Sequence, residues 1–474
     1  MKLLTIGQHF DVLKQIGFCG FGNVSFSFDQ KIKEIGNAEI HRIVFNKSVE
    51  EQPQDKSEKR ISSDSIYRDI RNNNYSAFYG HYFDRWAEFK IRESSKQNIP
   101  VISFAHDLIN SFLPLKNLVI DSTHSNFDSI IVPSYSGKQV ISNYLNYIND
   151  NYKKKFLGKI EVIPYGIDFT PKMTLSSDKI LARKSLRINC DTRYILSVGR
   201  FSKLYKTDLI PLIVVFNRII KNKEFDDVRL ILAGSIMDNY YFELVDFINK
   251  IGLSEKIVFI TNFSNSDKLL IYKAADVFVS LSDHPQETFG ISPIEAMACG
   301  LPLILSDWNG YKELVIDNKN GYKIPTSINK RLIDDSIIDA LGGYSKAIAI
   351  DLHMVYERLL LLLKDKLKRQ YLGENGVKVA EDSYCWEKIV DRFKLHLNTL
   401  NTISRNNPIY NKVKEPSVSK IFNHYYTEIY IQNFKNDQSY WSSFSNEEDQ
   451  LMSEFKKYTS SQDYLDFFKY KYGM

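Results

Sequence analysis

The segment from Val277 to Pro302 constrains the fold more than any other part of the sequence. It begins with a short apolar run typical of a buried strand, passes through a turn, and continues as a run typical of a helix. Ser292 is a suitable N-cap, Pro293 suits the first helical position, and Glu295 completes a capping box. A glycine and a proline then stop the helix. A strand that leads into a helix N-terminus presents free N–H groups and a positive dipole end, so this segment predicts an anion-binding turn.

Strand-like and helix-like runs alternate along most of the chain. Such alternation predicts parallel, doubly wound sheets, and 474 residues suffice for two or three domains. The expected fold class is therefore α/β, with two Rossmann-like domains. The strand-like runs are 3–6, 40–45, 101–105 and 129–133 in the first part, and 194–198, 228–233, 256–260, 277–281 and 303–306 in the second, with helical runs at 208–221, 240–251 and 266–275. The polar stretch 46–59 is expected to be a loop.

Composition excludes several classes of function. A net charge of +5, from 62 basic and 57 acidic residues, is too small to indicate a nucleic-acid-binding protein. The four cysteines lack metal-ligand spacing and predict reduced thiols. No apolar run reaches the length of a membrane span, and the N-terminus is typical of a first strand rather than a signal peptide. We therefore expect a cytoplasmic protein.

Two carboxylates eight positions apart, Glu287 and Glu295, flank the turn, and Ala296-Met297-Ala298-Cys299-Gly300-Leu301-Pro302 follows them. This pattern resembles the signature of the retaining glycosyltransferases of family 4, which have the GT-B fold of two facing Rossmann-like domains. The resemblance implies that Glu295 binds the ribose hydroxyls of a nucleotide-sugar donor and that Glu287 contacts the transferred sugar. It also implies that backbone N–H groups near the helix start bind the donor, at Phe289, Gly290 and Ile291. The structural alternative is a capping residue beside a solvated loop carboxylate.

A second basic segment follows the strand at 194–198. Gly199, Arg200 and Lys206 resemble the Gly-Arg…Lys pattern with which the family neutralises the donor diphosphate. Two fixed cations would stabilise the leaving group most in the transition state. Thr207 departs from the family, which often has glycine there, and Lys203 competes with Lys206 for the role. The alternative is a solvated basic loop. Gly234, at the end of another strand, is expected to line the same donor pocket.

The N-terminal half contributes fewer candidates. His106 ends a strand-like run, and the family commonly has a histidine here that contacts the donor sugar; a structural role is the alternative. Gly20 and Gly22 lie in a loop after the first strand, where the family has a glycine pair near the donor phosphate. The glycines alone are weak evidence for a phosphate-binding loop.

The resemblance also implies a domain organisation. Residues 1–168 would form an acceptor domain and residues 169–385 a nucleotide-sugar domain. Residues 386–400 would form a helix that crosses back onto the first domain, and an aromatic-rich extension would follow at 401–474, beginning with a linker over 401–416.

We therefore predict a retaining glycosyltransferase that moves a hexose-type sugar from a nucleotide-diphosphate sugar to an acceptor hydroxyl on a carbohydrate, a lipid-linked molecule or a protein. A role in bacterial surface polysaccharide or glycoconjugate synthesis is the expected pathway. No Asp-x-Asp motif occurs, so we expect no essential metal and no cofactor. The basic, apolar run Lys153–Lys159 suggests peripheral contact with the inner face of a membrane, against the alternative of a solvated helix end. The same sequence also allows a catalytically silent scaffold or sugar-binding partner, and a GT-B epimerase or phosphorylase.

Overall fold

The computed structural model describes residues 1–6, 20–44, 58–62, 66–81, 86–109, 111–169, 178–202, 206–284, 287–328 and 348–406. Most of the predicted extension at 401–474 therefore lies outside the described residues, as does Lys203.

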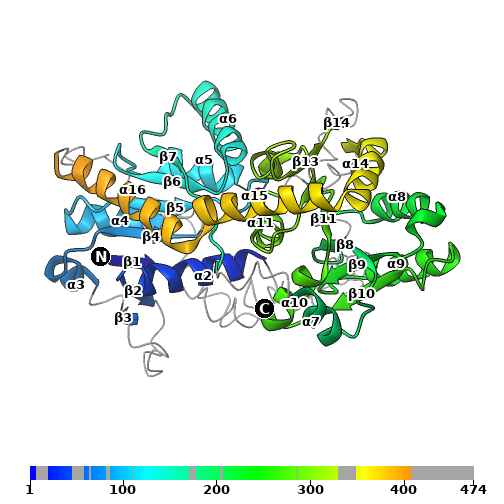
Figure 1. Cartoon of the computed structure of the whole chain (residues 1–474). Coiled ribbons are helices and arrows are strands. Elements are labelled where there is room, and N and C mark those ends of the chain that lie inside the picture. The colour runs from blue at the N-terminus through cyan, green and yellow to red at the C-terminus, as the bar shows by residue number, and fades with distance from the viewer. Residues whose placement is uncertain are drawn as a thin grey trace, which may run out of the picture. The chain divides into compact units, whose positions relative to one another are not determined.

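The first domain is built on a sheet of seven parallel strands in the order β3-β2-β1-β4-β5-β6-β7 (Figure 1). The strands are β1 (Lys2–Ile6), β2 (Glu39–Val44), β3 (Glu58–Ser62), β4 (Ala77–Gly80), β5 (Val101–Phe104), β6 (Ser129–Val132) and β7 (Lys159–Val162). The helices are α2 (Gly20–Glu34), α3 (Ile66–Asn72), α4 (Trp86–Ser95), α5 (Phe112–Asp121) and α6 (Tyr135–Tyr152).

The second domain contains six parallel strands in the order β10-β9-β8-β11-β12-β13. The strands are β8 (Arg193–Val198), β9 (Val228–Gly234), β10 (Ile257–Thr261), β11 (Val277–Ser280), β12 (Leu303–Ser306) and β13 (Gly321–Ile324). The helices are α7 (Asp178–Ser185), α8 (Ile210–Ile220), α9 (Tyr240–Lys250), α10 (Asn265–Ala274), α11 (Ile291–Ala298), α14 (Leu352–Lys364) and α15 (Lys366–Tyr384), with 3₁₀ helices η2 (Lys223–Phe225) and η3 (Asn309–Glu313). A small antiparallel pair, β14 (Thr326–Ile328) and β15 (Ile348–Ile350), adjoins this domain in sequence.

The strand order reverses once in each sheet. In the first sheet β1 lies between β2 and β4, and in the second β8 lies between β9 and β11. Helices that follow the two strands at such a point leave on opposite faces of the sheet, which opens a crevice at the carboxyl ends of the strands. The two predicted Rossmann-like domains are therefore confirmed, and the reversal in the second sheet falls beside the loops that follow β8 and β11.

The central strands are apolar because both faces of each sheet are covered. All four residues of β11 are buried, and so are all four of β12. β4 is buried in the same way but is absent from the sequence prediction, because a four-residue run without alternation gives little signal. The predicted loop at 46–59 ends earlier than expected, since β3 begins at Glu58 and pairs with β2.

The start of α2 differs from the sequence expectation. Gly20 and Gly22 lie in the first turn of this helix rather than in a loop. α2 packs against the sheet through buried Phe28 and Ile32, whose spacing of four places them on one face of the helix. The stretch between Ile6 and Gly20 lies outside the described residues.

The helix α16 (Trp386–Asn406) packs on the first domain (Figure 1). It buries Trp386, Ile389 and Phe393 in the same cluster as Phe28. The prediction that a linker begins at residue 401 is wrong for residues 401–406, which continue the helix. The helix continues because Ser404 is buried and exchanges two hydrogen bonds with the backbone and side chain of Asn98.

Candidate active site

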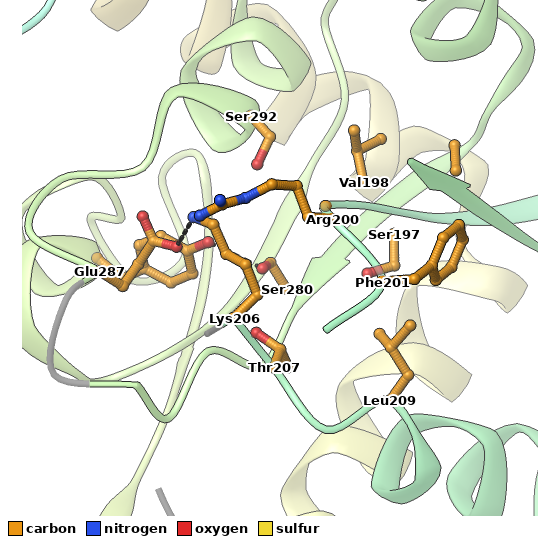
Figure 2. A pocket seen from close by; sticks show the side chains of 13 residues that line it. Ser197, Val198, Arg200, Phe201, Lys206, Thr207, Leu209, Ser280, Glu287 and Ser292 are labelled. Carbon is orange, nitrogen blue, oxygen red and sulfur yellow. Dashed lines mark hydrogen bonds and ion pairs between the residues drawn. The ribbon is translucent and has the colours of Figure 1, made fainter. Parts of the chain in front are cut away.

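A pocket lies at the carboxyl ends of β8 and β11, where the order of the second sheet reverses. Loops at such reversals bind the ligands of open α/β folds. The loop after β8 contributes Gly199, Arg200 and Lys206 to its lining, and the loop after β11 contributes Glu287 (Figure 2). The fold thus brings the two sequence segments that carry the prediction to one place.

The ion pair between Lys206 and Glu287 is the central polar contact of this pocket. Lys206 Nζ lies 2.8 Å from Glu287 Oε2. The Glu287 side chain is 10% exposed and that of Lys206 is 31% exposed, so the pair is shielded from bulk water but open to a ligand. In Figure 2, Arg200 extends across the pocket from the end of β8 toward this pair. The pocket therefore offers two cations and one carboxylate to an incoming molecule.

Tyr311, from η3, also lines the pocket, and no sequence pattern points to it. Its hydroxyl lies 2.9 Å from Ser280 Oγ, and it also hydrogen bonds with Ser292 and Glu287. Burial, with Glu287 adding to it, holds the pKa of Tyr311 well above its usual range, so the hydroxyl keeps its proton. A protonated hydroxyl can donate to the Glu287 carboxylate, which orients that side chain.

The start of α11 differs from the prediction. The N-cap is Gly290, with a φ of 108°, and the helix begins at Ile291. Ser292 is therefore not the N-cap, and the predicted capping box with Glu295 is wrong. The reason is that glycine reaches positive φ without strain, so the chain enters the helix two residues earlier than predicted. Ser292 lines the pocket instead.

Gly290 is also confined by its neighbours. A Cβ atom added there would lie 2.4 Å from Cε1 of Tyr311. The turn that carries Glu287 and Phe289 can therefore approach the Tyr311 ring only because residue 290 lacks a side chain. Phe289 is buried, so its contribution to a ligand would come from the backbone.

Glu295 lies one helical turn farther along α11 and has its own partners. It forms an ion pair with Lys268 and accepts a hydrogen bond of 2.9 Å from the Tyr272 hydroxyl. Its side chain is 15% exposed, and it is not among the residues that line the pocket around Lys206. The two carboxylates of the motif are thus held by separate sets of side chains, both from the second domain.

The glycines of the two neighbouring strand ends differ in their surroundings. A Cβ atom at Gly199 would meet no atom within 4 Å, so this position opens directly onto the pocket. A Cβ atom at Gly234 would lie 1.7 Å from the Gly199 carbonyl oxygen. Gly234 therefore lets β9 end close against the loop that carries Arg200.

The first domain contacts the segment that follows Glu287 and the neighbouring η3. Ser134 Oγ donates a 2.7 Å hydrogen bond to the Thr288 carbonyl oxygen. Glu313 of η3 accepts hydrogen bonds of 2.9 Å and 2.7 Å from the backbone N–H groups of Tyr135 and Ser136 at the start of α6. A carboxylate at a helix N-terminus is favoured by the helix dipole.

Comparison with known proteins finds a family match within the second domain. Residues 178–350 match the family model described as glycosyl transferases group 1. An uncharacterized glycosyltransferase of Methanocaldococcus jannaschii is 29% identical over 265 residues, which are 55% of this chain and 57% of that protein. A D-inositol 3-phosphate glycosyltransferase of Mycolicibacterium gilvum is 25% identical over 279 residues, 52% of this chain and 54% of that protein. The chain thus spans little more than half the length of these curated relatives.

Solved structures agree with the fold. Sucrose-phosphate synthase from Thermosynechococcus elongatus matches with a TM-score of 0.60 at 17% identity, over 85% of this chain and 100% of that chain. Anabaena HepE in complex with UDP also gives 0.60 at 17% identity, over 84% of this chain and 100% of that chain. At these identities the likeness concerns the fold alone, and it confirms the predicted GT-B architecture.

His106 lies at the carboxyl end of the first sheet, after β5, and is not among the residues that line the pocket. Its Nδ1 lies 2.6 Å from the Tyr165 hydroxyl and its Nε2 lies 3.0 Å from His81 Nδ1. The contact with a donor sugar predicted for His106 stays a prediction, and so do the donor-binding roles of Gly20 and Gly22.

Three residues of these sites are missing from the sequence prediction, namely His81, Tyr165 and Tyr311. They follow β4, β7 and β12 respectively. Tyr165 lies shortly after a strand end and could have been found by inspecting every strand end. His81 follows β4, which the sequence prediction lacks, and Tyr311 lies within η3, so the same rule would have missed both.

Proposed function

We propose that the protein is a retaining glycosyltransferase of the family 4 type, which transfers a hexose-type sugar from a nucleoside-diphosphate sugar to an acceptor hydroxyl. The observation that carries this proposal is the pocket at the β8–β11 reversal, in which Arg200 and Lys206 accompany Glu287. The match of residues 178–350 to group 1 glycosyltransferases supports it. The complexes of Anabaena HepE with UDP and with UDP-glucose support a nucleotide-sugar donor.

The chemistry of the transfer fits the charges of the pocket. The bond between the anomeric carbon and the diphosphate oxygen breaks, and negative charge grows on the leaving diphosphate. Arg200 and Lys206 would stabilise this charge, and they would do so most strongly in the transition state. Glu287 would hold the sugar, with its carboxylate oriented by Tyr311 and its charge balanced by Lys206. Glu295 would accept hydrogen bonds from the ribose hydroxyls.

In this proposal the acceptor hydroxyl attacks the same face of the sugar that the diphosphate leaves. Because the acceptor oxygen bonds to the anomeric carbon on the face that the diphosphate leaves, the configuration there is retained, and the acceptor proton passes to an oxygen of the leaving diphosphate. The acceptor, a carbohydrate, a lipid-linked molecule or a protein, would bind the first domain. We place the reaction in surface polysaccharide or glycoconjugate synthesis, and we propose that it needs no metal ion. Turnover that survives chelation of divalent cations would support the last point, and NMR of the product linkage tests retention.

The donor site is tested by thermal unfolding with UDP-, GDP- and ADP-sugars. A ligand at 100 times its Kd should stabilise the folded protein by about 2.7 kcal/mol. The matched variant is Gly199→Ala, because the added methyl group meets no protein atom and should leave the free protein's stability unchanged. It would nonetheless occupy pocket space. We expect one nucleotide class to raise the melting temperature of the natural protein and to raise it much less in Gly199→Ala. Equal shifts in both proteins would place the donor elsewhere, and no shift with any nucleotide sugar would contradict the proposed function.

We also propose peripheral contact with an anionic membrane through the end of α6. No helix in the described part of the chain is long and apolar enough to cross a bilayer. Lys153, Lys154 and Lys155 are exposed, and so are Tyr152 and Leu157 beside them, at 44% and 57%. Exposed lysines with apolar neighbours are the composition that binds the interface of anionic lipids.

Vesicle sedimentation tests this contact. Replacing the lysines at 153–155 by glutamate should abolish binding to vesicles that contain phosphatidylserine, and vesicles of phosphatidylcholine alone should bind neither protein. A control variant with the same change of charge replaces exposed Lys221, Lys223 and Lys250 by glutamate. Loss of binding in the control as well would assign the effect to net charge rather than to this surface.

A further inference from the structure

A network of hydrogen bonds, here called the histidine network, links four side chains of the first domain. Asp29 Oδ1, from α2, lies 3.2 Å from His81 Nε2. His81 Nδ1 lies 3.0 Å from His106 Nε2, and His106 Nδ1 lies 2.6 Å from the Tyr165 hydroxyl. The four side chains come from α2 and from the segments after β4, β5 and β7. Both ring nitrogens of each histidine therefore have a partner within the histidine network.

The direction of the hydrogen bonds follows from the chemistry of the first member. An ionised carboxylate only accepts, so His81 Nε2 must carry a hydrogen. In a neutral imidazole the other nitrogen then accepts, and His106 Nε2 must donate to it. His106 Nδ1 is consequently an acceptor and takes the hydrogen of the Tyr165 hydroxyl. The carboxylate thus determines which nitrogen of His106 carries the hydrogen, although His81 lies between them.

The surroundings of His106 favour its uncharged form. Asp29 and His81 are buried, and the Phe104 ring lies against both imidazoles, with ring centroids 4.9 Å from His81 and 5.9 Å from His106. Burial, with the neighbouring His81 adding to it, holds the pKa of His106 well below its usual range. His106 is therefore uncharged near neutral pH. Tyr79 donates a second hydrogen bond of 2.9 Å to Asp29 Oδ1, which fixes that carboxylate in place.

Tyr165 connects the histidine network to the proposed donor site. Its ring meets the ring of Phe289 edge-on, with centroids 5.2 Å apart and an interplanar angle of 80°. Thr288 Oγ1 also approaches the His106 carbonyl oxygen at 3.4 Å. Phe289 and Thr288 directly follow Glu287, so a change in the orientation of Tyr165 would move the residues that carry the Glu287 carboxylate.

We propose that Asp29, His81 and Tyr165 are positioning residues, which fix the tautomer of His106 with its hydrogen on Nε2 and hold Tyr165 against the segment that follows Glu287. This inference rests on the proposed function for its effect on turnover, but the tautomer itself does not. The first domain then contributes to the orientation of the donor-side segment as well as to the proposed binding of the acceptor.

The tautomer is tested by NMR on the full chain labelled with ¹⁵N-histidine, because the protonated and unprotonated nitrogens of a neutral imidazole resonate far apart. Signals are assigned with His106→Gln and His81→Gln. We expect His106 to show hydrogen on Nε2 alone. In Asp29→Leu, which removes the acceptor, and in Tyr165→Phe, which removes the donor to Nδ1, the ¹⁵N shifts of His106 should move. Asp29→Asn keeps an oxygen that can accept from His81 and should restore shifts close to those of the natural protein.

Two results would overturn the inference. One is hydrogen on Nδ1 of His106 in the natural protein, and the other is unchanged His106 shifts in both Asp29→Leu and Tyr165→Phe. The control is Tyr194→Phe, which removes a buried tyrosine hydroxyl in the second domain and should leave the His106 shifts alone. Near-ultraviolet circular dichroism of each variant shows whether it is folded.

Turnover provides the second readout. Loss of one buried hydrogen bond in Tyr165→Phe should lower kcat by about 10-fold and leave KM for the donor nearly unchanged. In the Asp29 series, kcat should fall in Asp29→Leu and recover in Asp29→Asn. A fall in donor affinity without a change in kcat would contradict a positioning role. If no nucleotide sugar binds the natural protein, the proposed function fails, and the NMR result still decides the tautomer.

Discussion

Replacing Lys206 by alanine is expected to lower glycosyl transfer by roughly 100-fold or more, because the pocket loses one of the two cations that stabilise the leaving diphosphate. The same substitution leaves Glu287 without its partner at 2.8 Å in a nearly closed environment. An uncompensated carboxylate there should lower the free energy of unfolding by about 1–3 kcal/mol. Measurement of kcat and of urea unfolding on the same preparations checks both expectations.

A second variant separates the two effects of that substitution. In Lys206→Ala combined with Glu287→Gln the uncompensated charge is gone, so stability should return towards that of the natural protein while turnover stays low. Lys250→Ala is the matched control, because Lys250 forms an exposed ion pair with Asp246 on α9, away from the pocket. Turnover that recovers together with stability in the double variant would mean that Lys206 serves the fold alone.

Gly290→Ala is expected to have the largest effect on stability. The new Cβ atom would lie 2.4 Å from the Tyr311 ring, and the residue would have to adopt a φ of 108°. Overpacking costs about 1–3 kcal/mol and a positive φ costs a further 1–2 kcal/mol or so, which together predict a loss of about 3 kcal/mol. Because Tyr311 also orients Glu287, turnover should fall even at temperatures where the variant is folded. Urea unfolding and the steady-state rate measure the two consequences.

Gly252→Ala is the control for the cost of a positive φ. Gly252 also has a positive φ, of 72°, but a Cβ atom there would meet nothing within 4 Å. Its substitution should therefore cost only about 1 kcal/mol and leave turnover unchanged. Equal costs at positions 252 and 290 would show that the Tyr311 ring moves aside freely, and that the turn before α11 is less confined than its geometry indicates.

The fold can be predicted largely from local pattern. Apolar runs such as 194–198 and 277–281, each followed by a helical run, indicate parallel strands because only buried strands are apolar on both faces. The pattern fails where the run is short, as in β4, and where a boundary depends on a distant contact. The polar sequence of residues 401–406 predicts a linker, yet Ser404 is buried against Asn98.

Part of the candidate site can be predicted in the same way. Arg200, Lys206 and Glu287 follow strands and resemble a known signature, and the fold brings them to one pocket. Ser292 is a favourable N-cap residue by type, but the cap lies at Gly290 because its φ is positive. A backbone angle of this kind depends on the packing of the turn against Tyr311, which the local sequence does not show.

The histidine network could not be predicted from local sequence patterns. His106 stands out in the sequence as a histidine at a strand end, but its partners do not. Asp29 belongs to a helix and His81 to the end of another strand, and both meet His106 only through the packing of separate elements. The tautomer of His106 therefore depends on residues that no local pattern connects to it.

The alternation of strands and helices, the approximate ends of those elements and the residue types at the strand ends depend on neighbours within a few positions, so they could be derived without coordinates. Which strand ends meet is a property of the folded chain. The fold brings both Lys206 and Tyr311 to Glu287, and it places Tyr165 in contact with His106 and Phe289. These contacts follow from the strand order and from packing between the domains, which join residues far apart in the chain, and interactions between near neighbours cannot encode such pairings.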